Sequence, residues 1–268
     1  MEITDFSEQV IKRSYTIPVL VDFWAKWCSA CKILSPTLEI LKERHKDEWE
    51  LAKVEVEQHP ELAVMYNITS IPSVKLFVNG NVVGEFSGAV PGHVLENWLK
   101  DVLPPKLQRD IHNAENLIRE GHEIKAQQIL SKVLNEDPGN KEAEVLYAKS
   151  IVIRKPVEAL DLIRNMDVLG HLGDTIDAIR TIAKFLTRFH TSSELPPGQA
   201  KPMVSEAIAA LVNHDFDTAL KKLIDALKAD PQFIDGLIKD VCIALFNYLG
   251  ENSDLTIKYR RLFGRILF

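Results

Sequence analysis

Two cysteines separated by two residues are the clearest candidates for chemistry in this chain. They stand in Cys28-Ser29-Ala30-Cys31, at the start of a segment with helical periodicity. At the beginning of a helix this spacing places both sulfurs on one side, close enough to bridge. A helix N-terminus also stabilises a thiolate. The pattern therefore predicts thiol–disulfide exchange, with Cys28 as the exposed attacking sulfur and Cys31 as the more buried resolving sulfur.

The same spacing also occurs as half of a zinc site. That site needs two further ligands, usually a second Cys-x-x-Cys or a histidine pair. The third cysteine, Cys242, lies far along the chain, and the eight histidines show no ligand spacing. We therefore expect no metal and no cofactor. Cys242 stands in the apolar run 241–246 and is expected to be a buried small hydrophobic residue rather than a reactive thiol.

The elements that position the dithiol follow from hydrophobic periodicity. An apolar run around Asp22 predicts a strand buried on both faces, with a solvent-facing edge position as the alternative for this acid. Asn79-Gly80 between two apolar runs predicts a β-hairpin. The order of elements suits one sheet with helices on both faces. We expect strands at 17–24, 50–57, 73–78 and 82–87, and helices at 28–46, 60–67 and 91–102.

The chain changes character after Leu103-Pro104-Pro105, which we take as a domain boundary. From residue 106 onward only helical spacing is found. Residues 111–138 and 204–231 align without gaps at an offset of 93 residues. A period near 34 residues and a closing Asp-Pro are typical of tetratricopeptide repeats. The segment 191–202 interrupts the array and is expected to be an exposed linker. The identical pairs are Ala114/Ala207, Ala126/Ala219, Leu130/Leu223, Leu134/Leu227, Asp137/Asp230 and Pro138/Pro231.

Composition narrows the classes of partner. The chain is 46% hydrophobic and 26% charged, as in an ordinary soluble globular protein. The net charge of −6 argues against nucleic acid as a main partner. No apolar run is long enough to span a bilayer, and the N-terminus does not resemble a signal peptide. Three cysteines are too few for a disulfide framework, so a reducing compartment is expected.

Residues 21–32, Val-Asp-Phe-Trp-Ala-Lys-Trp-Cys-Ser-Ala-Cys-Lys, closely resemble the active-site segment of thioredoxins. The resemblance continues through Ile71-Pro72 and Asn79-Gly80 and spans about residues 5–103. It implies an α/β thioredoxin fold. It departs at Ser29-Ala30, where thioredoxins usually have Gly-Pro, and this departure changes the stability of the dithiol and argues against a general cytosolic reductant.

The resemblance assigns roles to residues around the cysteines. Asp22 would be the buried acid that assists deprotonation of Cys31, and Lys53 would lie near it. A carboxyl group in an apolar strand is expected to have a raised pKa, which suits a proton acceptor. Trp27 would flank the exposed sulfur. Ile71-Pro72, with the cis-proline of thioredoxins, would line the groove for an extended client chain.

Taken over its whole length, the chain resembles the chaperedoxin family of bacterial co-chaperones, in which a thioredoxin domain precedes tetratricopeptide-like helices. The residues near the C-terminus carry this resemblance most sharply, in Tyr259-Arg260-Arg261-Leu262-Phe263. Their spacing predicts an amphipathic helix over 254–268. Such a helix can dock in a partner's groove or cap the preceding repeat, with a membrane surface as a weaker third alternative. The resemblance favours docking on the chaperonin, and implies contacts from Tyr259, Arg260, Arg261, Leu262, Phe263, Ile266 and Leu267.

These observations predict an α/β thioredoxin domain at 1–103 and an all-α tetratricopeptide-like domain at 106–268. The expected function is a redox-active co-chaperone of the bacterial cytoplasm that holds unfolding clients and passes them to the chaperonin. The alternative is a protein-disulfide reductase whose repeats only select substrates. The expected partners are unfolded or oxidised clients, the chaperonin and, as a further candidate, thioredoxin reductase, but not nucleic acid or a membrane.

Overall fold

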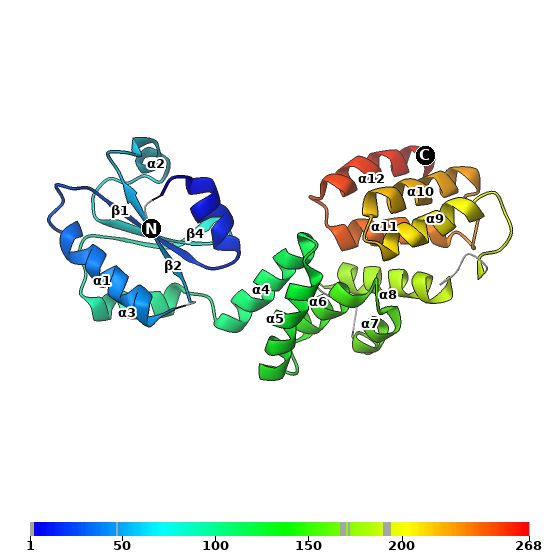
Figure 1. Cartoon of the computed structure of the whole chain (residues 1–268), viewed down its shortest axis with the longest axis horizontal. Helices are drawn as coiled ribbons and strands as arrows, with labels where there is room; N and C mark the ends of the chain where they lie inside the picture. The colour runs from blue at the N-terminus through cyan, green and yellow to red at the C-terminus, as the bar shows by residue number, and fades with distance from the viewer. Residues whose placement is uncertain (1–2, 47, 167–169, 171, 190–193, 268) are drawn as a thin grey trace. The chain divides into compact units, whose positions relative to one another are not determined.

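The computed structural model describes residues 3–46, 48–166, 170, 172–189 and 194–267 (Figure 1). The chain divides into two compact units, Met1–Asn116 and Leu117–Phe268, here termed the α/β unit and the helical unit. No helix within the described ranges combines the length and the apolar character that crossing a membrane requires.

The α/β unit is built on one four-stranded sheet with the strand order β2-β1-β3-β4. Strands β1 and β2 are parallel, whereas β3 is antiparallel to both β1 and β4. The predicted order of strands and helices is confirmed, and η1 and η2 are additions that precede β1. The elements are η1 (Ser7–Lys12), η2 (Arg13–Tyr15), β1 (Val19–Trp24), α1 (Cys31–Arg44), β2 (Glu50–Glu55), α2 (Pro60–Met65), β3 (Ser73–Val78), β4 (Asn81–Ser87), α3 (Gly92–Val102) and most of α4 (Lys106–Arg119).

The sheet lies between two hydrophobic layers. Leu20 of β1 packs with leucines of α1 and α3 on one face. Val21 and Phe23 of the same strand pack with residues of η1 and α2 on the other. Strand β1 is therefore buried on both faces, as its apolar run predicts. The hairpin between β3 and β4 turns at Asn79 and Gly80, which have φ values of 54° and 78°, the left-handed conformation that this dipeptide favours.

The two units divide inside α4 rather than at the proline pair that the sequence suggests as a boundary. The guanidinium of Arg109 donates to the Glu48 carbonyl, and Asn116 Nδ2 donates to the Tyr15 carbonyl at 3.0 Å. These hydrogen bonds attach most of α4 to the α/β unit. Pro104 and Pro105 interrupt the helical pattern, but the contacts with the α/β unit continue beyond them.

In its described residues the helical unit contains helices and no strand, as predicted. Helices α5 to α8 pack in succession, α9 packs on α10, α11 packs on α8, and α12 packs on α10 and α11. The repeated positions Ala126 and Ala219 are fully buried, as are Leu130 and Leu223. The helices of this unit after α4 are α5 (Glu123–Glu136), α6 (Lys141–Ile151), α7 (Pro156–Leu162), α8 (Gly173–Arg188), α9 (Lys201–Val212), α10 (Phe216–Ala229), α11 (Leu237–Leu249) and α12 (Asp254–Leu267).

The expectation of an exposed linker over 191–202 is confirmed for most of its described part, since residues 194, 196–199 and 202 are exposed, but two residues depart from it. Leu195 and Ala200 are buried in the helical core. Lys201 already belongs to α9, and its ammonium group donates to the Leu195 carbonyl at 2.9 Å. An apolar side chain within a polar, proline-containing segment is enough to anchor that segment. Residues 191–193 lie outside the described ranges.

Candidate active site

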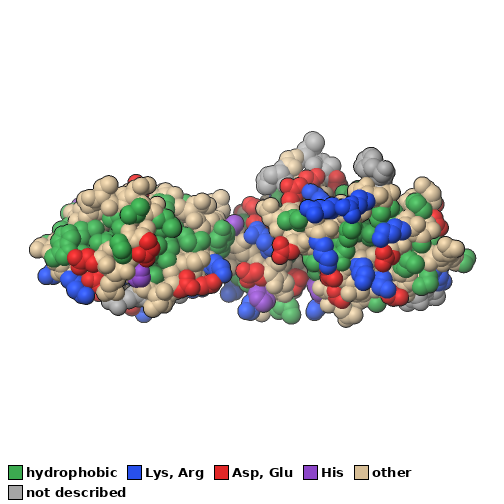
Figure 2. Space-filling view, turned by 90° about the horizontal axis from the view of Figure 1, so that it is seen from above, with side chains coloured by type: hydrophobic (Ala, Val, Ile, Leu, Met, Phe, Trp, Pro, Cys, Tyr) green, Lys and Arg blue, Asp and Glu red, His purple; other side chains and the backbone are tan. Residues whose placement is uncertain are grey.

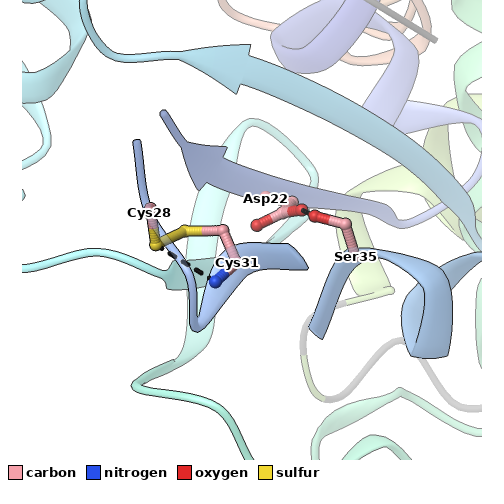
Figure 3. The surroundings of a disulfide bond; sticks show 4 residues. All are labelled: Asp22, Cys28, Cys31 and Ser35. Atoms are coloured by element: carbon pink, nitrogen blue, oxygen red, sulfur yellow. Dashed lines mark hydrogen bonds between the residues drawn. A yellow bond between two sulfur atoms is a disulfide. The ribbon is translucent and has the colours of Figure 1, made fainter. Parts of the chain in front are cut away.

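The sulfurs of Cys28 and Cys31 are joined in a disulfide, with their Cα atoms 5.3 Å apart (Figure 3). Cys31 is the first residue of α1, so the bond closes across the N-terminal end of that helix. The predicted geometry, with both sulfurs on one side and within bonding distance, is confirmed. The bond between the two sulfurs is what a redox dithiol requires.

The end of α1 donates a hydrogen bond to one of these sulfurs. The backbone N–H of Cys31 lies 3.1 Å from Cys28 Sγ, as the dashed line in Figure 3 marks. Cys28 retains 5% of its surface exposed and Cys31 1%, so Cys28 is the more accessible of the two. A donor aimed at a sulfur stabilises the thiolate formed on reduction. Cys31 is the more buried sulfur, as predicted, but Cys28 is also buried and not exposed as the sequence suggests.

A buried carboxyl group lies behind the disulfide. Asp22, on β1, is fully buried, which removes the alternative of a solvent-facing position. Its Oδ2 accepts a hydrogen bond from the Ser35 hydroxyl at 2.6 Å, while Oδ1 has no hydrogen-bond partner within the described residues. Burial raises the pKa of Asp22, and the Ser35 hydrogen bond and the charge of Lys53 act against that rise. The raised pKa that the apolar strand predicts is thus present.

Lys53 occupies the position directly across from Asp22 in the parallel pairing of β1 and β2. Its ammonium group forms an ion pair with Glu39 of α1. Lys53 therefore lies near Asp22, as expected, but its direct partner is another carboxylate.

Trp27 directly precedes Cys28 in the loop between β1 and α1, and Ile71-Pro72 directly precede β3. The Trp27 side chain is 66% exposed, and its indole N–H donates to Glu57 at 2.9 Å. Ile71 packs against the cluster that contains both cysteines. The peptide bond between Ile71 and Pro72 is cis, as the resemblance implies. Ile71 is therefore in contact with the cluster around the disulfide, and Trp27 adds an exposed aromatic ring next to Cys28 in the sequence.

Three residues near the site were not anticipated: Ser35, Glu39 and Glu57. Ser35 and Glu39 follow Cys31 at intervals of four residues, so one stripe of α1 carries all three. That spacing is visible in the sequence, but the partners of these side chains on β1 and β2 are set by packing between distant segments.

The third cysteine belongs to the core of the helical unit. Cys242 is fully buried in α11, and burial raises the pKa of its thiol to about 12. The prediction that Cys242 is a buried residue of an apolar core is confirmed.

The apolar side of helix α12 packs against the core of the helical unit. Tyr259 and Phe263 are buried, and Ile266 packs against the same core. The Tyr259 hydroxyl donates to Asp217 of α10 at 3.1 Å, and Phe263 packs edge-on against Phe246 of α11. Capping of the preceding helices, one of the two alternatives for this segment, is therefore what the structure contains.

The remaining residues expected to contact a chaperonin are exposed where the structure describes them. Arg260, Arg261 and Leu262 are exposed, and Arg260 also pairs with Glu251 at 3.3 Å. The side chain of Leu267 lies outside the described residues. Four exposed side chains of α12, those of Ile257, Arg261, Leu262 and Arg265, are here termed the exposed tail face. Asp254, Lys258 and Arg260 of the same helix are also exposed.

Comparison with known proteins matches the two units to different families. The thioredoxin family model matches residues 1–101, and a tetratricopeptide-repeat model matches residues 194–268. Thioredoxin from Griffithsia pacifica is 42% identical over 97 residues, which are 87% of that protein and 36% of this chain. Thioredoxin from Alicyclobacillus acidocaldarius is 44% identical over 86 residues, or 82% of its length and 32% of this chain. Synechococcus elongatus thioredoxin 1 is 38% identical over 94 residues, covering 86% of its length and 35% of this chain.

These relatives are covered over nearly their whole length, and they align with the unit that contains the disulfide. The first unit therefore has a thioredoxin fold with a Cys-x-x-Cys pair capable of disulfide formation, which supports thiol–disulfide redox activity. The helices that follow include a tetratricopeptide-like region. The chain belongs to the thioredoxin family and extends it with a tetratricopeptide-like helical unit.

Proposed function

We propose that this protein is a redox-active co-chaperone of the chaperedoxin type. It holds unfolding clients, protects or exchanges their thiols through Cys28 and Cys31, and passes them to the chaperonin in the bacterial cytoplasm. The observation that carries this proposal is a complete dithiol on a thioredoxin fold within the same chain as tetratricopeptide-like helices. Such helical arrays offer extended surfaces for binding other proteins. Figure 2 shows hydrophobic side chains on the visible face of the α/β unit, and an unfolding client can bind to such side chains.

Protection begins from the disulfide form. A client thiolate attacks Cys28 Sγ, the bond between the two cysteines breaks, and Cys31 leaves as a thiolate. The proton that Cys31 then takes comes from the Asp22 carboxyl group, whose raised pKa keeps a proton available. While the mixed disulfide lasts, the client sulfur cannot be oxidised further.

Exchange runs in the opposite direction. The Cys28 thiolate of the reduced form attacks a client disulfide and releases one client thiolate. Cys31 then transfers its proton to the Asp22 carboxylate and attacks Cys28 Sγ, which releases the second client thiolate and restores the disulfide. Two electrons pass from the dithiol to the client, and the client disulfide is reduced.

The alternative is a protein-disulfide reductase whose helical unit only selects substrates. The match of residues 1–101 to the thioredoxin family model favours this alternative.

Insulin reduction by the wild type tests the redox activity, with Cys28→Ser as the inactive variant and Cys242→Ser as the matched control. No activity in the wild type would exclude exchange. Aggregation of a heat-denatured client in the presence of Cys28→Ser/Cys31→Ser tests the holdase, and loss of protection in that variant would favour the alternative.

Chaperonin association is tested through α12. Deletion of residues 255–268 should abolish co-purification with the chaperonin and leave thiol exchange intact. Because that deletion also uncovers the surface on which Tyr259 and Phe263 pack, the sharper variant is Arg261→Glu/Leu262→Ser on the exposed tail face. Lys239→Glu/Ile243→Ser is its matched control, since both side chains are exposed on α11. Equal co-purification of the two double variants would refute a contact through the exposed tail face.

A further inference from the structure

Behind the disulfide, residues on one side of α1 contact a pair of residues that lie opposite each other on two neighbouring strands. Cys31, Ser35 and Glu39 stand four residues apart, so they lie along the same side of the helix. Asp22 and Lys53 stand opposite each other on β1 and β2. Ser35 donates to Asp22, and Glu39 pairs with Lys53. This side of α1 therefore contacts both members of the Asp22–Lys53 pair, and Cys31 lies one helical turn from Ser35.

The two oxygens of the Asp22 carboxyl group are in different situations. Oδ2 is occupied by the Ser35 hydroxyl at 2.6 Å, and Oδ1 has no hydrogen-bond partner within the described residues. In the view of Figure 3 the Asp22 side chain lies between Ser35 and Cys31, with its second oxygen on the side of the cysteines. A carboxyl group held through one oxygen keeps the other in a fixed direction.

We propose that Ser35 is a positioning residue for the proton transfer between Cys31 and Asp22. Its hydroxyl fixes the carboxyl group through Oδ2, so that Oδ1 is the atom that exchanges a proton with Cys31. This inference rests on the thiol–disulfide exchange proposed above and concerns one step of it.

The proton balance of that step is simple. In the mixed disulfide, Cys31 S–H gives its proton to Oδ1 of the carboxylate, and the resulting thiolate attacks Cys28 Sγ. The Ser35 hydroxyl keeps its own proton and donates the hydrogen bond throughout. When Cys31 leaves as a thiolate in the reverse direction, the proton returns from Oδ1.

Ser35 also affects how readily Asp22 ionises. Burial raises the pKa of this carboxyl group, and the Ser35 hydrogen bond is the largest influence in the opposite direction. The charged groups facing Asp22 are Lys53 of β2, which lowers its pKa, and Glu39 of α1, which raises it. On β3 the residue paired with Asp22 is the uncharged Val74. Removal of the hydroxyl is therefore expected to make the carboxyl group harder to ionise.

The first test measures the ionisation of Asp22 without any client. Carbon-13 NMR of the side-chain carboxyl follows its titration in the oxidised protein for the wild type, Ser35→Ala, Ser35→Thr and Ser35→Val. Threonine keeps the hydroxyl and valine removes it at nearly the same volume. We expect Ser35→Ala and Ser35→Val to raise the midpoint by about one to two pH units, since hydrogen bonds to charged groups are of that size. Ser35→Thr should titrate as the wild type.

Thr37→Ala is the matched control, because the Thr37 hydroxyl donates to the Ile33 carbonyl of the same helix and not to Asp22. A midpoint that is the same in Ser35→Thr and Ser35→Val overturns the proposal. So does an equal shift in Thr37→Ala, which would show a general response of α1.

The second test follows the attack of Cys31 on a preformed mixed disulfide at Cys28 as a function of pH. The midpoint of this rate profile should rise in Ser35→Val by the same amount as the titration, and should be unchanged in Ser35→Thr. In an Asp22→Asn background, Ser35→Val should produce no shift, because Ser35 acts through Asp22. A shift that persists in that background refutes the positioning role. Since the titration needs no client, absence of insulin reduction in the wild type would refute exchange without deciding the outcome of the titration.

Discussion

The two units of this protein place the same residue type in opposite environments. In the α/β unit, Cys28 lies at the end of a helix with the N–H of Cys31 directed at its sulfur. In the helical unit, Cys242 lies within α11 among apolar side chains. A helix end stabilises a negative sulfur, whereas an apolar core disfavours it. The difference shows that position along a helix, and not the presence of a thiol, separates a reactive cysteine from a structural one.

The units also differ in what they bury. The α/β unit buries the carboxyl group of Asp22 next to its disulfide, at a cost in free energy of folding. The helical unit buries aromatic and aliphatic side chains from α10, α11 and α12. Substitution of Asp22 should therefore change reactivity and the pH dependence of stability, and substitution of the buried side chains of the helical unit should lower stability at any pH.

The largest expected effect concerns the thiols themselves. After reduction, alkylation of Cys28 at neutral pH should be at least about a thousandfold faster than alkylation of Cys242, because the buried thiol is hardly ionised and must first be exposed by opening of the structure. Mass spectrometry of iodoacetamide-treated protein measures both rates. In denaturant the two rates should converge. Similar rates in the folded protein would contradict the comparison.

The next effect is on the stability of the helical unit. Phe263→Ala should lower the free energy of unfolding by about 3–4 kcal/mol, because this ring is buried against Phe246. Leu262→Ala, at the neighbouring exposed position, should lower it by less than about 1 kcal/mol. Urea titrations followed by far-UV circular dichroism measure both. Equal losses would mean that α12 does not pack by the face seen here.

A smaller effect of opposite sign is expected at Asp22. Its pKa is raised in the folded state, so the stability linked to its bound proton is complete below the unfolded pKa and is lost as pH rises through the folded pKa. Asp22→Asn should therefore stabilise the oxidised α/β unit by about 1–3 kcal/mol at pH 8, and the gain should shrink as pH falls. Tryptophan fluorescence during urea unfolding reports this unit, since Trp24, Trp27, Trp49 and Trp98 are the only tryptophans of the chain.

The exposed carboxyl of Asp101 provides the control for that measurement. Asp101→Asn removes the same charge from the surface of α3 and should change stability by less than about 0.5 kcal/mol at either pH. A pH-independent gain in Asp22→Asn would show that burial of the ionised group is not the cause.

The sequence predicts the sheet and its reactive centre because both depend on short-range patterns. Apolar runs of strand length, Asn79-Gly80 and the cysteine spacing each have a local physical cause. The segment η1 has no such pattern, since among its six residues Val10 alone is buried, and the sequence does not predict it. Its position is set by packing against the sheet rather than by periodicity.

Two features of the site and the tail show where local patterns end. Ser35 lies 13 residues from its partner Asp22, and a serine within a helix is more often exposed, so the contact appears only when α1 is placed on β1. The stripe of Tyr259, Phe263 and Ile266 predicts an amphipathic helix but not what covers it. Packing within the chain and docking on a partner require the same spacing. Only the positions of α10 and α11 decide between them.

A small change in stability is also expected at Trp27, the exposed aromatic residue of the α/β unit and the counterpart of the buried Phe263. With 66% of its surface exposed and one hydrogen bond to Glu57, it contributes little to folding. Trp27→Phe should change the free energy of unfolding by less than about 1 kcal/mol. Insulin reduction by Trp27→Phe should nevertheless require a several-fold higher substrate concentration, because a large exposed ring beside the reactive sulfur is suited to client contact.

Glu57→Gln is the control, because it keeps a hydrogen-bond acceptor for the indole and should preserve both stability and insulin reduction. A loss of stability in Trp27→Phe comparable to that in Phe263→Ala would mean that both units use their aromatic residues for folding, and would remove the contrast between them.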